Sequence, residues 1–200
     1  MYLIGIMGLQ GSGKDTLYKE LERLMTPHRV VRLAFADALK EEVARACGTT
    51  VEFINEHKKH FRLIMQGWGT NFRRELFGDE YWIKQWMIRA NSVSMSKNTY
   101  CMIVTDVRFL NEAQCIKDLG GRLIRIYRNA AVQDDAHQSE TEMQDIQPDF
   151  MIANHGNIEE LQKNTITLLN QLKEKYLNGN KYHTEDTSKT GAAIIHPTTL

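Results

Sequence analysis

A glycine-rich segment near the N-terminus constrains this chain more than any other feature. Residues 8–16 read GLQGSGKDT and match the pattern G-x-x-x-x-G-K. They follow a nearly continuous apolar run at residues 2–7 and precede a helical pattern in which Leu17, Leu21 and Leu24 share one face. A loop of this kind between a buried strand and a helix is typical of a phosphate-binding loop. The preceding strand is then expected to lie in a parallel sheet that helices cover.

The chemistry of this loop predicts its ligand. Glycines allow successive backbone N–H groups to converge on phosphate oxygens without side-chain clashes, and the following helix adds its positive N-terminal end. We expect the Lys14 amine to reach the β- and γ-phosphates of ATP. The residues expected to bind ATP are Gly8, Gly11, Ser12, Gly13, Lys14, Asp15 and Thr16.

Two carboxylates indicate a magnesium site. Asp15 stands after the lysine, where Ser or Thr is usual, and Thr16 follows it. Asp106 comes directly after a strongly apolar run at residues 100–105. Because ligands bind at the carboxyl ends of parallel strands, Asp106 is expected beside the loop, although it also fits a helix N-cap. Carboxylates and hydroxyls are hard oxygen ligands, so we expect Mg²⁺ at Asp15, Thr16 and Asp106.

Strand and helix patterns alternate along the chain and predict an α/β fold. The expected strands are residues 2–7, 30–35, 100–105, 122–127 and 150–153. The expected helices follow the loop and span residues 36–47, 109–119 and 158–177, with a mostly helical stretch at 53–96 that breaks near Gly67 and Gly69 and at 78–79. The alternation predicts a three-layer P-loop NTPase fold, with a five-stranded parallel sheet flanked by helices and right-handed crossovers.

The same patterns divide the chain into functional regions. Residues 1–177 are expected to form one kinase domain. Within it, residues 48–98 are predicted to be a helical acceptor-binding region. Residues 129–149, which are polar and read as irregular, are predicted to be a lid. The polar residues 178–200 are predicted to be a C-terminal tail outside the core.

Composition excludes several classes of protein. Lys plus Arg and Asp plus Glu both number 25, and the resulting zero net charge argues against a protein that coats nucleic acid or an anionic membrane. The three cysteines form no CxxC pair, which favours reduced thiols and a cytoplasmic protein. No apolar run approaches the roughly 20 residues of a membrane span, so no membrane partner is expected. His57 and His60 have no third ligand nearby, which argues against a zinc site.

The size of the chain suits a small-molecule kinase, which needs a second anion-binding pocket for its acceptor and a lid that excludes water. Basic side chains concentrate in one short segment: Lys58, Lys59, Arg62, Arg73 and Arg74. Arg62 with Arg73 or Arg74 would clamp a phosphate, whereas Lys58 and Lys59 fit a solvated helix face. Trp68 and Trp82 are candidates to stack on a base. Trp82 and Trp86, four residues apart, also fit a core-facing stripe.

Several sequence blocks occur in an order that resembles a known family. They are GSGKDT at 11–16, FADALK at 35–40, QGWGTNFRR at 66–74, GDEYW at 78–82, TDVRFLNE at 105–112 and HQSE at 137–140. The chain resembles the phage-type deoxynucleoside monophosphate kinases, P-loop kinases related to adenylate and phosphomevalonate kinases. The resemblance implies ATP- and Mg²⁺-dependent phosphoryl transfer to a (deoxy)nucleoside monophosphate. It also implies small nucleotides as partners, a location in the cytoplasm of a cell or phage host, and a homodimer as one possible assembly.

The resemblance also implies roles for individual residues. Lys14, Asp106 and Arg108 would be catalytic, and Arg128 would contact ATP where the lid begins. The residues expected at the acceptor are Asp37, Lys40, Arg62, Gln66, Arg74, Trp82, Arg108, His137, Ser139 and Glu140. Asn71 departs from the family pattern, which commonly has an acid there. The predicted lid contains no Lys or Arg, so Arg128 would be its main cation.

Two other functions fit parts of the sequence. Related phage P-loop kinases phosphorylate 5-hydroxymethyluracil, a hydroxymethylated pyrimidine, within DNA. The basic segment at 58–74 could bind such a strand, whereas the zero net charge disfavours it. DNA is a partner only under this alternative. A regulatory module that binds nucleotide without turnover is disfavoured, because Asp106 and Arg108 accompany an intact phosphate loop.

Overall fold

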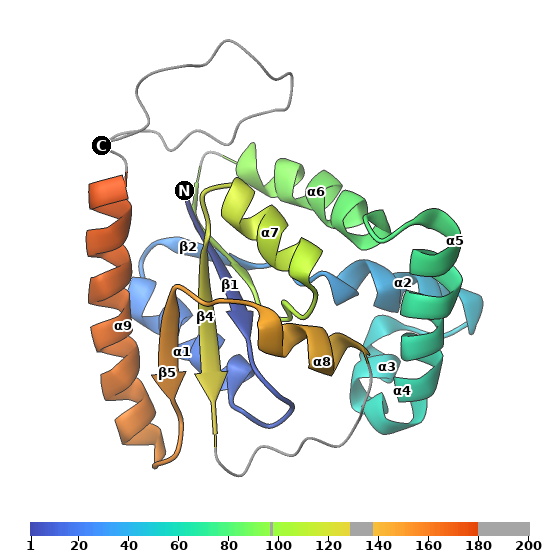
Figure 1. Cartoon of the computed structure of the whole chain (residues 1–200), viewed down its shortest axis with the longest axis horizontal. Helices are drawn as coiled ribbons and strands as arrows, with labels where there is room; N and C mark the ends of the chain where they lie inside the picture. The colour runs from blue at the N-terminus through green and yellow to red at the C-terminus, as the bar shows by residue number, and fades with distance from the viewer. Residues whose placement is uncertain (97, 129–137, 180–200) are drawn as a thin grey trace. The chain divides into compact units, whose positions relative to one another are not determined.

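Five strands form one parallel sheet, as the sequence predicts. The structure, a computed structural model, describes residues 1–96, 98–128 and 138–179, with only the backbone for 138–141 and 176–179. The strand order is β2-β3-β1-β4-β5, and every neighbouring pair is parallel (Figure 1). The strands are β1 Tyr2–Met7, β2 Arg29–Arg32, β3 Thr99–Val104, β4 Arg122–Tyr127 and β5 Phe150–Ala153.

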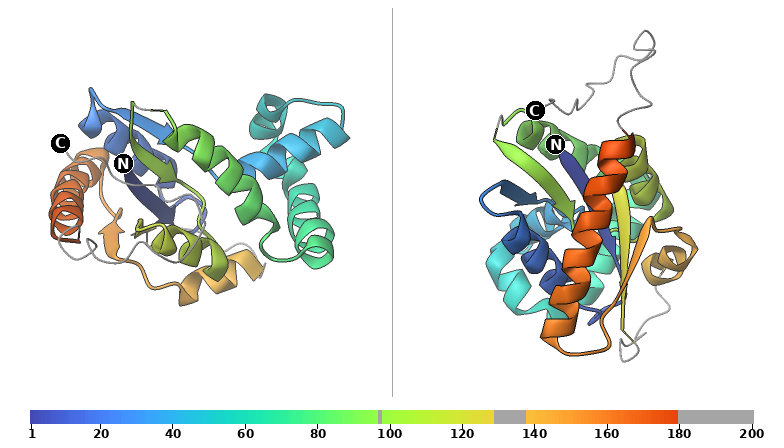
Figure 2. Two further views of the ribbon diagram at one scale, coloured as in Figure 1. Left: turned by 90° about the horizontal axis from the view of Figure 1, so that it is seen from above. Right: turned by 90° about the vertical axis from the view of Figure 1, so that its left-hand side faces the viewer.

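Helices cover both faces of this sheet and complete the three layers. Helices α1 (Lys14–Met25) and α9 (Ile158–Gly179) pack on one face, where Leu17, Leu21 and Leu168 join a buried apolar cluster with isoleucines of four strands. Helices α7 (Leu110–Asp118) and α8 (Gln138–Asp145) lie on the opposite face (Figure 2). Apolar side chains therefore fill both sides of the central strands, which explains why those strands read as continuous apolar runs.

The chain separates into two compact units. The sheet unit comprises Met1–Arg32 and Ser96–Leu200, and the helical unit comprises Leu33–Met95. The helical unit contains α2 (Ala36–Ala46), α3 (Val51–Glu56), α4 (Lys58–Gly67), η1 (Trp68–Arg74), α5 (Glu75–Phe77) and α6 (Tyr81–Ser94). The predicted helical content of this stretch is confirmed, and its acceptor-binding role stays a prediction. Within the described ranges, no helix is both long and apolar enough to cross a bilayer.

The predicted helix break at Gly67 and Gly69 is wrong. Helix α4 continues without interruption into the π-helix η1, which ends at Arg74. Gly69 is buried, and a Cβ atom there would lie 3.0 Å from Cδ2 of Leu39. The glycine therefore allows α2 to approach η1 closely. Sequence alone does not distinguish a glycine needed for such packing from one that ends a helix. The break at Gly78 is real, with φ at 93°.

Three further boundaries differ from the prediction. Strand β2 ends at Arg32, and the carbonyl of Leu33 accepts a hydrogen bond from Nε1 of Trp86 (2.9 Å) within the helical unit. Residues 138–145, predicted as irregular, form α8, whose Met143 is buried on the sheet unit. Helix α9 runs to Gly179, and Ile158, predicted on its buried face, is 49% exposed.

Candidate active site

The phosphate loop follows β1, and at two of its positions the surrounding atoms leave room only for glycine. A Cβ atom on Gly8 would lie 2.3 Å from the carbonyl oxygen of Ile126. Gly13 has φ of 103°, and a Cβ atom there would lie 2.3 Å from Nδ2 of Asn154. The loop therefore lies directly against the carboxyl ends of β4 and β5, where residues with side chains would be excluded.

Lys14 lies folded along this loop. It is the first residue of α1, and its Nζ donates to the carbonyl oxygens of Gly8 (2.6 Å) and Leu9 (2.9 Å). The amine is therefore held on the loop itself. Its predicted role on the donor phosphates stays a prediction.

Ser12 is the most buried residue of the loop, with only 1% of its surface exposed. Its carbonyl oxygen accepts a hydrogen bond from Nδ2 of Asn154 (2.9 Å), and its backbone N–H donates to the carbonyl of Leu9 (3.2 Å). Within the described residues its Oγ atom is buried and has no hydrogen-bond partner. Buried hydroxyls are normally satisfied, so an orphaned one in a phosphate loop fits an anionic ligand.

Asp106 lies where the sequence predicts it, at the carboxyl edge of the sheet. It follows β3, which is the neighbour of β1, and the register pairs Gly5 with Val104. The backbone N–H of Val107 donates to the carbonyl of Ile6 (3.2 Å), which ties this segment to the strand that enters the loop. The Asp106 backbone is thus fixed next to the start of the phosphate loop.

A buried glutamate that sequence reasoning missed positions Arg108. Oε2 of Glu112 accepts hydrogen bonds from the backbone N–H groups of Arg108 (2.9 Å) and Phe109 (3.2 Å). Glu112 is only 3% exposed, so it holds the start of α7 rigidly. An acidic residue in the third position of a helix, able to reach back to the helix start, was the signal available in sequence.

The oxygen ligands around the loop fit a nucleotide-bound Mg²⁺. Asp15 and Thr16 lie in the first turn of α1, where Asp15 is exposed and Thr16 half-buried, and Asp106 is half-buried. No group of three or more His, Cys, Asp or Glu that could hold a metal ion occurs among the described residues. Mg²⁺ bound with nucleotides usually takes one or two carboxylates and completes its shell with phosphates and water. The oxygen atoms of Asp15, Thr16 and Asp106 form a ligand set of that kind.

Arg128 is exposed and follows β4, the other neighbour of β1, so it lies at the same sheet edge as the loop. The structure therefore gathers the predicted ATP and metal residues at one edge of the sheet unit. Of the predicted lid residues, His137 lies outside the described residues. Ser139 and Glu140 lie on α8, and their side chains are also outside the description.

In the helical unit, one carboxylate organises the basic segment. Glu42 on α2 accepts hydrogen bonds from Nε of Arg73 (2.6 Å), Nε1 of Trp68 (3.0 Å) and Oη of Tyr81 (2.5 Å). Burial disfavours the charged carboxylate, but the hydrogen bonds from Trp68, Tyr81 and Arg73 outweigh it and lower the pKa of Glu42. Sequence reasoning missed this residue because its three partners come from distant positions.

Arg73 is enclosed by aromatic rings as well as by Glu42. Its guanidinium carbon lies 5.2–5.7 Å from the ring centres of Trp68, Phe72, Phe77 and Tyr81. These distances suit cation–π attraction, which adds to the ion pair. Arg73 therefore stabilises the helical unit, and Trp68, a candidate for base stacking, is part of the same cluster.

Arg74, predicted to bind the acceptor phosphate, is only 6% exposed. Its Nη1 donates to the carbonyl oxygen of Asp79 (3.0 Å), across the turn that Gly78 makes. Trp82 is 3% exposed, and its Nε1 donates to the carbonyl of Gly69 (2.9 Å). Together with Trp86 it is a core residue, as the four-residue spacing indicates, and its contact with an acceptor stays a prediction.

The remaining acceptor candidates lie on two helices of this unit. Asp37 supports the start of α2, because its Oδ2 accepts a hydrogen bond from the backbone N–H of Ala34 (2.9 Å). Lys40 lies half-buried on α2, and Arg62 and Gln66 lie half-buried on α4. The exposed positions of Lys58 and Lys59 agree with a solvated helix face.

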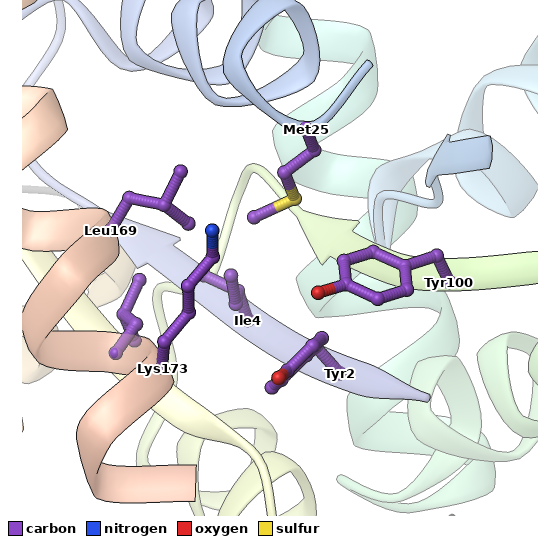
Figure 3. Close-up of a pocket in the computed structure, with 7 residues that line it drawn as sticks. Tyr2, Ile4, Met25, Tyr100, Leu169 and Lys173 are labelled. Atoms are coloured by element: carbon purple, nitrogen blue, oxygen red, sulfur yellow. The ribbon is translucent and has the colours of Figure 1, made fainter. Parts of the chain in front are cut away.

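A small hollow lies at the other end of the sheet, near the amino ends of β1 and β3 (Figure 3). The side chains of Tyr2, Met25, Tyr100 and Lys173 line it. Its volume is about 10 Å³, which is room for one water molecule at most. Burial, together with a hydrogen bond between the two hydroxyls of Tyr100 and Tyr2, raises the pKa of Tyr100 to about 12. This hollow is too small to be a nucleotide site.

Solved structures of two small kinases resemble this chain. Shikimate kinase from Aquifex aeolicus is 19% identical with a TM-score of 0.47, and the match covers 88% of this chain and 99% of that one. The APS kinase CysC of Mycobacterium tuberculosis is 13% identical with a TM-score of 0.41, covering 84% of this chain and 96% of that one. The architecture itself is established by the strand order and the helices on both faces.

Sequence comparison identifies the family. The family model of deoxynucleotide monophosphate kinase matches residues 46–165. A protein of Acanthamoeba polyphaga mimivirus named for this activity is 31% identical over 192 residues, which is 84% of this chain and 95% of the relative. The deoxynucleotide monophosphate kinase of Escherichia phage RB69 is 30% identical over 100 residues, 50% of this chain and 41% of that enzyme. The chain belongs to the deoxynucleotide monophosphate kinase family, and it is a P-loop phosphotransferase that phosphorylates deoxynucleoside monophosphates.

Proposed function

We propose that this enzyme transfers the γ-phosphoryl group of ATP to the phosphate of a deoxynucleoside monophosphate. An oxygen of the acceptor phosphate forms the new bond to the γ-phosphorus, the bond to the β–γ bridging oxygen breaks, and ADP leaves. The products are ADP and the deoxynucleoside diphosphate. The observation that carries the proposal is the glycine-requiring loop with Lys14 folded along it, at the carboxyl edge of the sheet, in a chain of this family.

The loop and its neighbours would bind the donor. The backbone N–H groups of Gly11 and of residues 13–16, together with the Lys14 amine, would surround the phosphates. Lys14 would neutralise charge as it develops on them. Asp15, Thr16 and Asp106 would hold Mg²⁺, which would supply further positive charge to offset the charge of the phosphates. Arg128, at the same sheet edge, is proposed to contact ATP.

Arginines would bind the acceptor phosphate. A guanidinium group presents paired N–H donors that match a phosphate, so we assign Arg74 and Arg108 to this role. The buried Glu112 holds the backbone of Arg108, which limits the positions that the Arg108 side chain can reach and supports this assignment. The other residues proposed at the acceptor are Asp37, Lys40, Arg62, Gln66, Trp82, His137, Ser139 and Glu140. A cytoplasmic location, where these nucleotides occur, and a homodimer stay predictions.

The proposal is tested with purified protein, ATP and Mg²⁺ against a panel of acceptors. The panel comprises the four common deoxynucleoside monophosphates, hydroxymethylated pyrimidine monophosphates and a DNA oligomer that contains 5-hydroxymethyluracil. Chromatography should show ADP and a deoxynucleoside diphosphate formed in equal amounts. A phosphorylated oligomer without any diphosphate product would overturn the proposal and favour the DNA-modifying alternative.

The metal assignment has its own test. Asp15→Ala removes a carboxylate from the first turn of α1, and we expect the Mg²⁺ concentration for half-maximal rate to rise several-fold. Glu22→Ala, near the other end of α1, is the matched control and should leave that concentration unchanged. An unchanged Mg²⁺ dependence in Asp15→Ala would assign Asp15 to charge complementarity with the helix N-terminus instead.

A further inference from the structure

A buried asparagine connects the last strand of the sheet to the phosphate loop. Asn154 follows β5, is 9% exposed, and donates its backbone N–H to the carbonyl of Tyr127 (2.9 Å). Its side chain donates from Nδ2 to the carbonyl oxygen of Ser12 (2.9 Å). A carbonyl oxygen can only accept, so the NH₂ end of the Asn154 side chain must face it.

This hydrogen bond fixes the direction of one peptide group in the loop. In a trans peptide the C=O and N–H bonds point in opposite directions. The carbonyl of Ser12 points to Asn154, so the N–H of Gly13 in the same peptide points away from Asn154. Backbone N–H groups in such loops are phosphate donors, and their direction decides whether they can converge on one oxygen.

The close approach of Asn154 also explains the glycine it faces. A Cβ atom on Gly13 would lie 2.3 Å from Nδ2 and 3.5 Å from Cγ of Asn154. Gly13 is therefore required both by its φ of 103° and by the space that Asn154 occupies. The two residues form a matched pair, although they come from opposite ends of the kinase domain sequence.

We infer that Asn154 is a positioning residue for the donor phosphates, which it serves by orienting the Ser12–Gly13 peptide of the phosphate loop. The inference rests on the proposed function, in which this loop binds ATP. Asn154 acts through the loop backbone. Its loss should weaken ATP binding and leave the interaction with the acceptor unchanged.

The test is the equilibrium dissociation constant of ATP, measured by calorimetry for the full chain and its variants. Asn154→Ala and the near-isosteric Asn154→Leu both remove the N–H donor, and we expect each to raise the constant on the order of tenfold. Asn164→Ala is the matched control, because Nδ2 of Asn164 donates to the carbonyl of the adjacent Ala153 (3.4 Å) and not to the loop. That variant should bind ATP within about twofold of the wild type.

A second readout separates positioning from a general loss of structure. The KM for the deoxynucleoside monophosphate should stay within about twofold of the wild type in Asn154→Leu, while the KM for ATP rises. ATP binding at wild-type strength in a folded Asn154 variant, or an equal loss in Asn164→Ala, would overturn the inference. If the wild type itself does not bind ATP, the proposed function fails, and the inference fails with it.

Discussion

Two regions of this molecule carry the basic residues of the predicted site, and they use them differently. On the phosphate loop, Lys14 donates to the backbone carbonyls of Gly8 and Leu9. In the helical unit, Arg73 is paired with Glu42 and enclosed by four rings, and Arg74 is buried against the carbonyl of Asp79. Lys14 therefore lies along the phosphate loop, whereas Arg73 holds helices of its own unit together.

The difference shows how far a basic cluster in a sequence can be interpreted. A cation beside glycines is placed by local backbone geometry, so its role can be inferred from a short motif. A cation on a helix can pair with any acidic or aromatic side chain that the fold brings near. Adjacent arginines such as Arg73 and Arg74 are therefore separate cases, although their sequence context is the same.

The largest effect is expected at Lys14. Lys14→Ala should lower kcat by at least about a hundred- to a thousandfold, because a positive charge positioned on the transferring phosphate is lost. The melting temperature should change little, since the side chain bonds to carbonyls of the loop rather than to the core. Lys19→Ala, on the same helix and farther from the loop, is the control and should retain full activity. Near-normal turnover in folded Lys14→Ala would remove the assignment of the loop.

The second effect concerns the stability of the helical unit. Glu42→Ala should lower the free energy of unfolding by about 2–4 kcal/mol, because Arg73, Trp68 and Tyr81 lose their common acceptor. Glu41→Ala is the control, since the ion pair of Glu41 with Arg89 is more exposed and should contribute less than about 1 kcal/mol. Urea denaturation measures both. Equal losses in the two variants would contradict the structural role of the Glu42 cluster.

A smaller effect is expected from pH. The pKa of Glu42 in the folded protein lies below its ordinary value of 4.5, so the ionised carboxylate stabilises the folded state. That stabilisation is complete above pH 4.5 and is lost as the pH falls through the lower folded pKa. The stability gap between wild type and Glu42→Gln should therefore narrow as the pH is lowered below 4.5. A gap that stays constant or widens on acidification would contradict the lowered pKa.

Much of the sheet unit could be predicted because its signals are local. The apolar runs of β1, β4 and β5 have the bounds that the sequence indicates, and β3 differs by one residue. The phosphate loop and Asp106 lie at the predicted ends of their strands, since parallel strands bring the residues after their carboxyl ends to one edge of the sheet. These features depend on short stretches of sequence and not on contacts between distant segments.

The features that the sequence did not predict depend on contacts between residues far apart in the chain. In the sequence, the glycines at the start of the π-helix Trp68–Arg74 look like a helix break. Gly69 is instead needed because Leu39 packs against it, and that contact joins two distant segments. Asn154 carries no motif, and its partner is a backbone carbonyl near the N-terminus. Glu42 is one of two adjacent glutamates, and only the fold shows that it is the one that accepts three side-chain hydrogen bonds.

The central claim is that the phosphate loop binds ATP and that two arginines bind the acceptor. It is tested most directly by the KM for ATP and the KM for the deoxynucleoside monophosphate in Arg74→Lys and Arg108→Lys. Lysine keeps the charge but loses the paired donors, so the KM for the deoxynucleoside monophosphate should rise roughly tenfold. The KM for ATP should change less than about twofold. Arg73→Lys is the control and should lower stability without separating the two constants. A rise in the KM for ATP alone would assign these arginines to the donor and contradict the account.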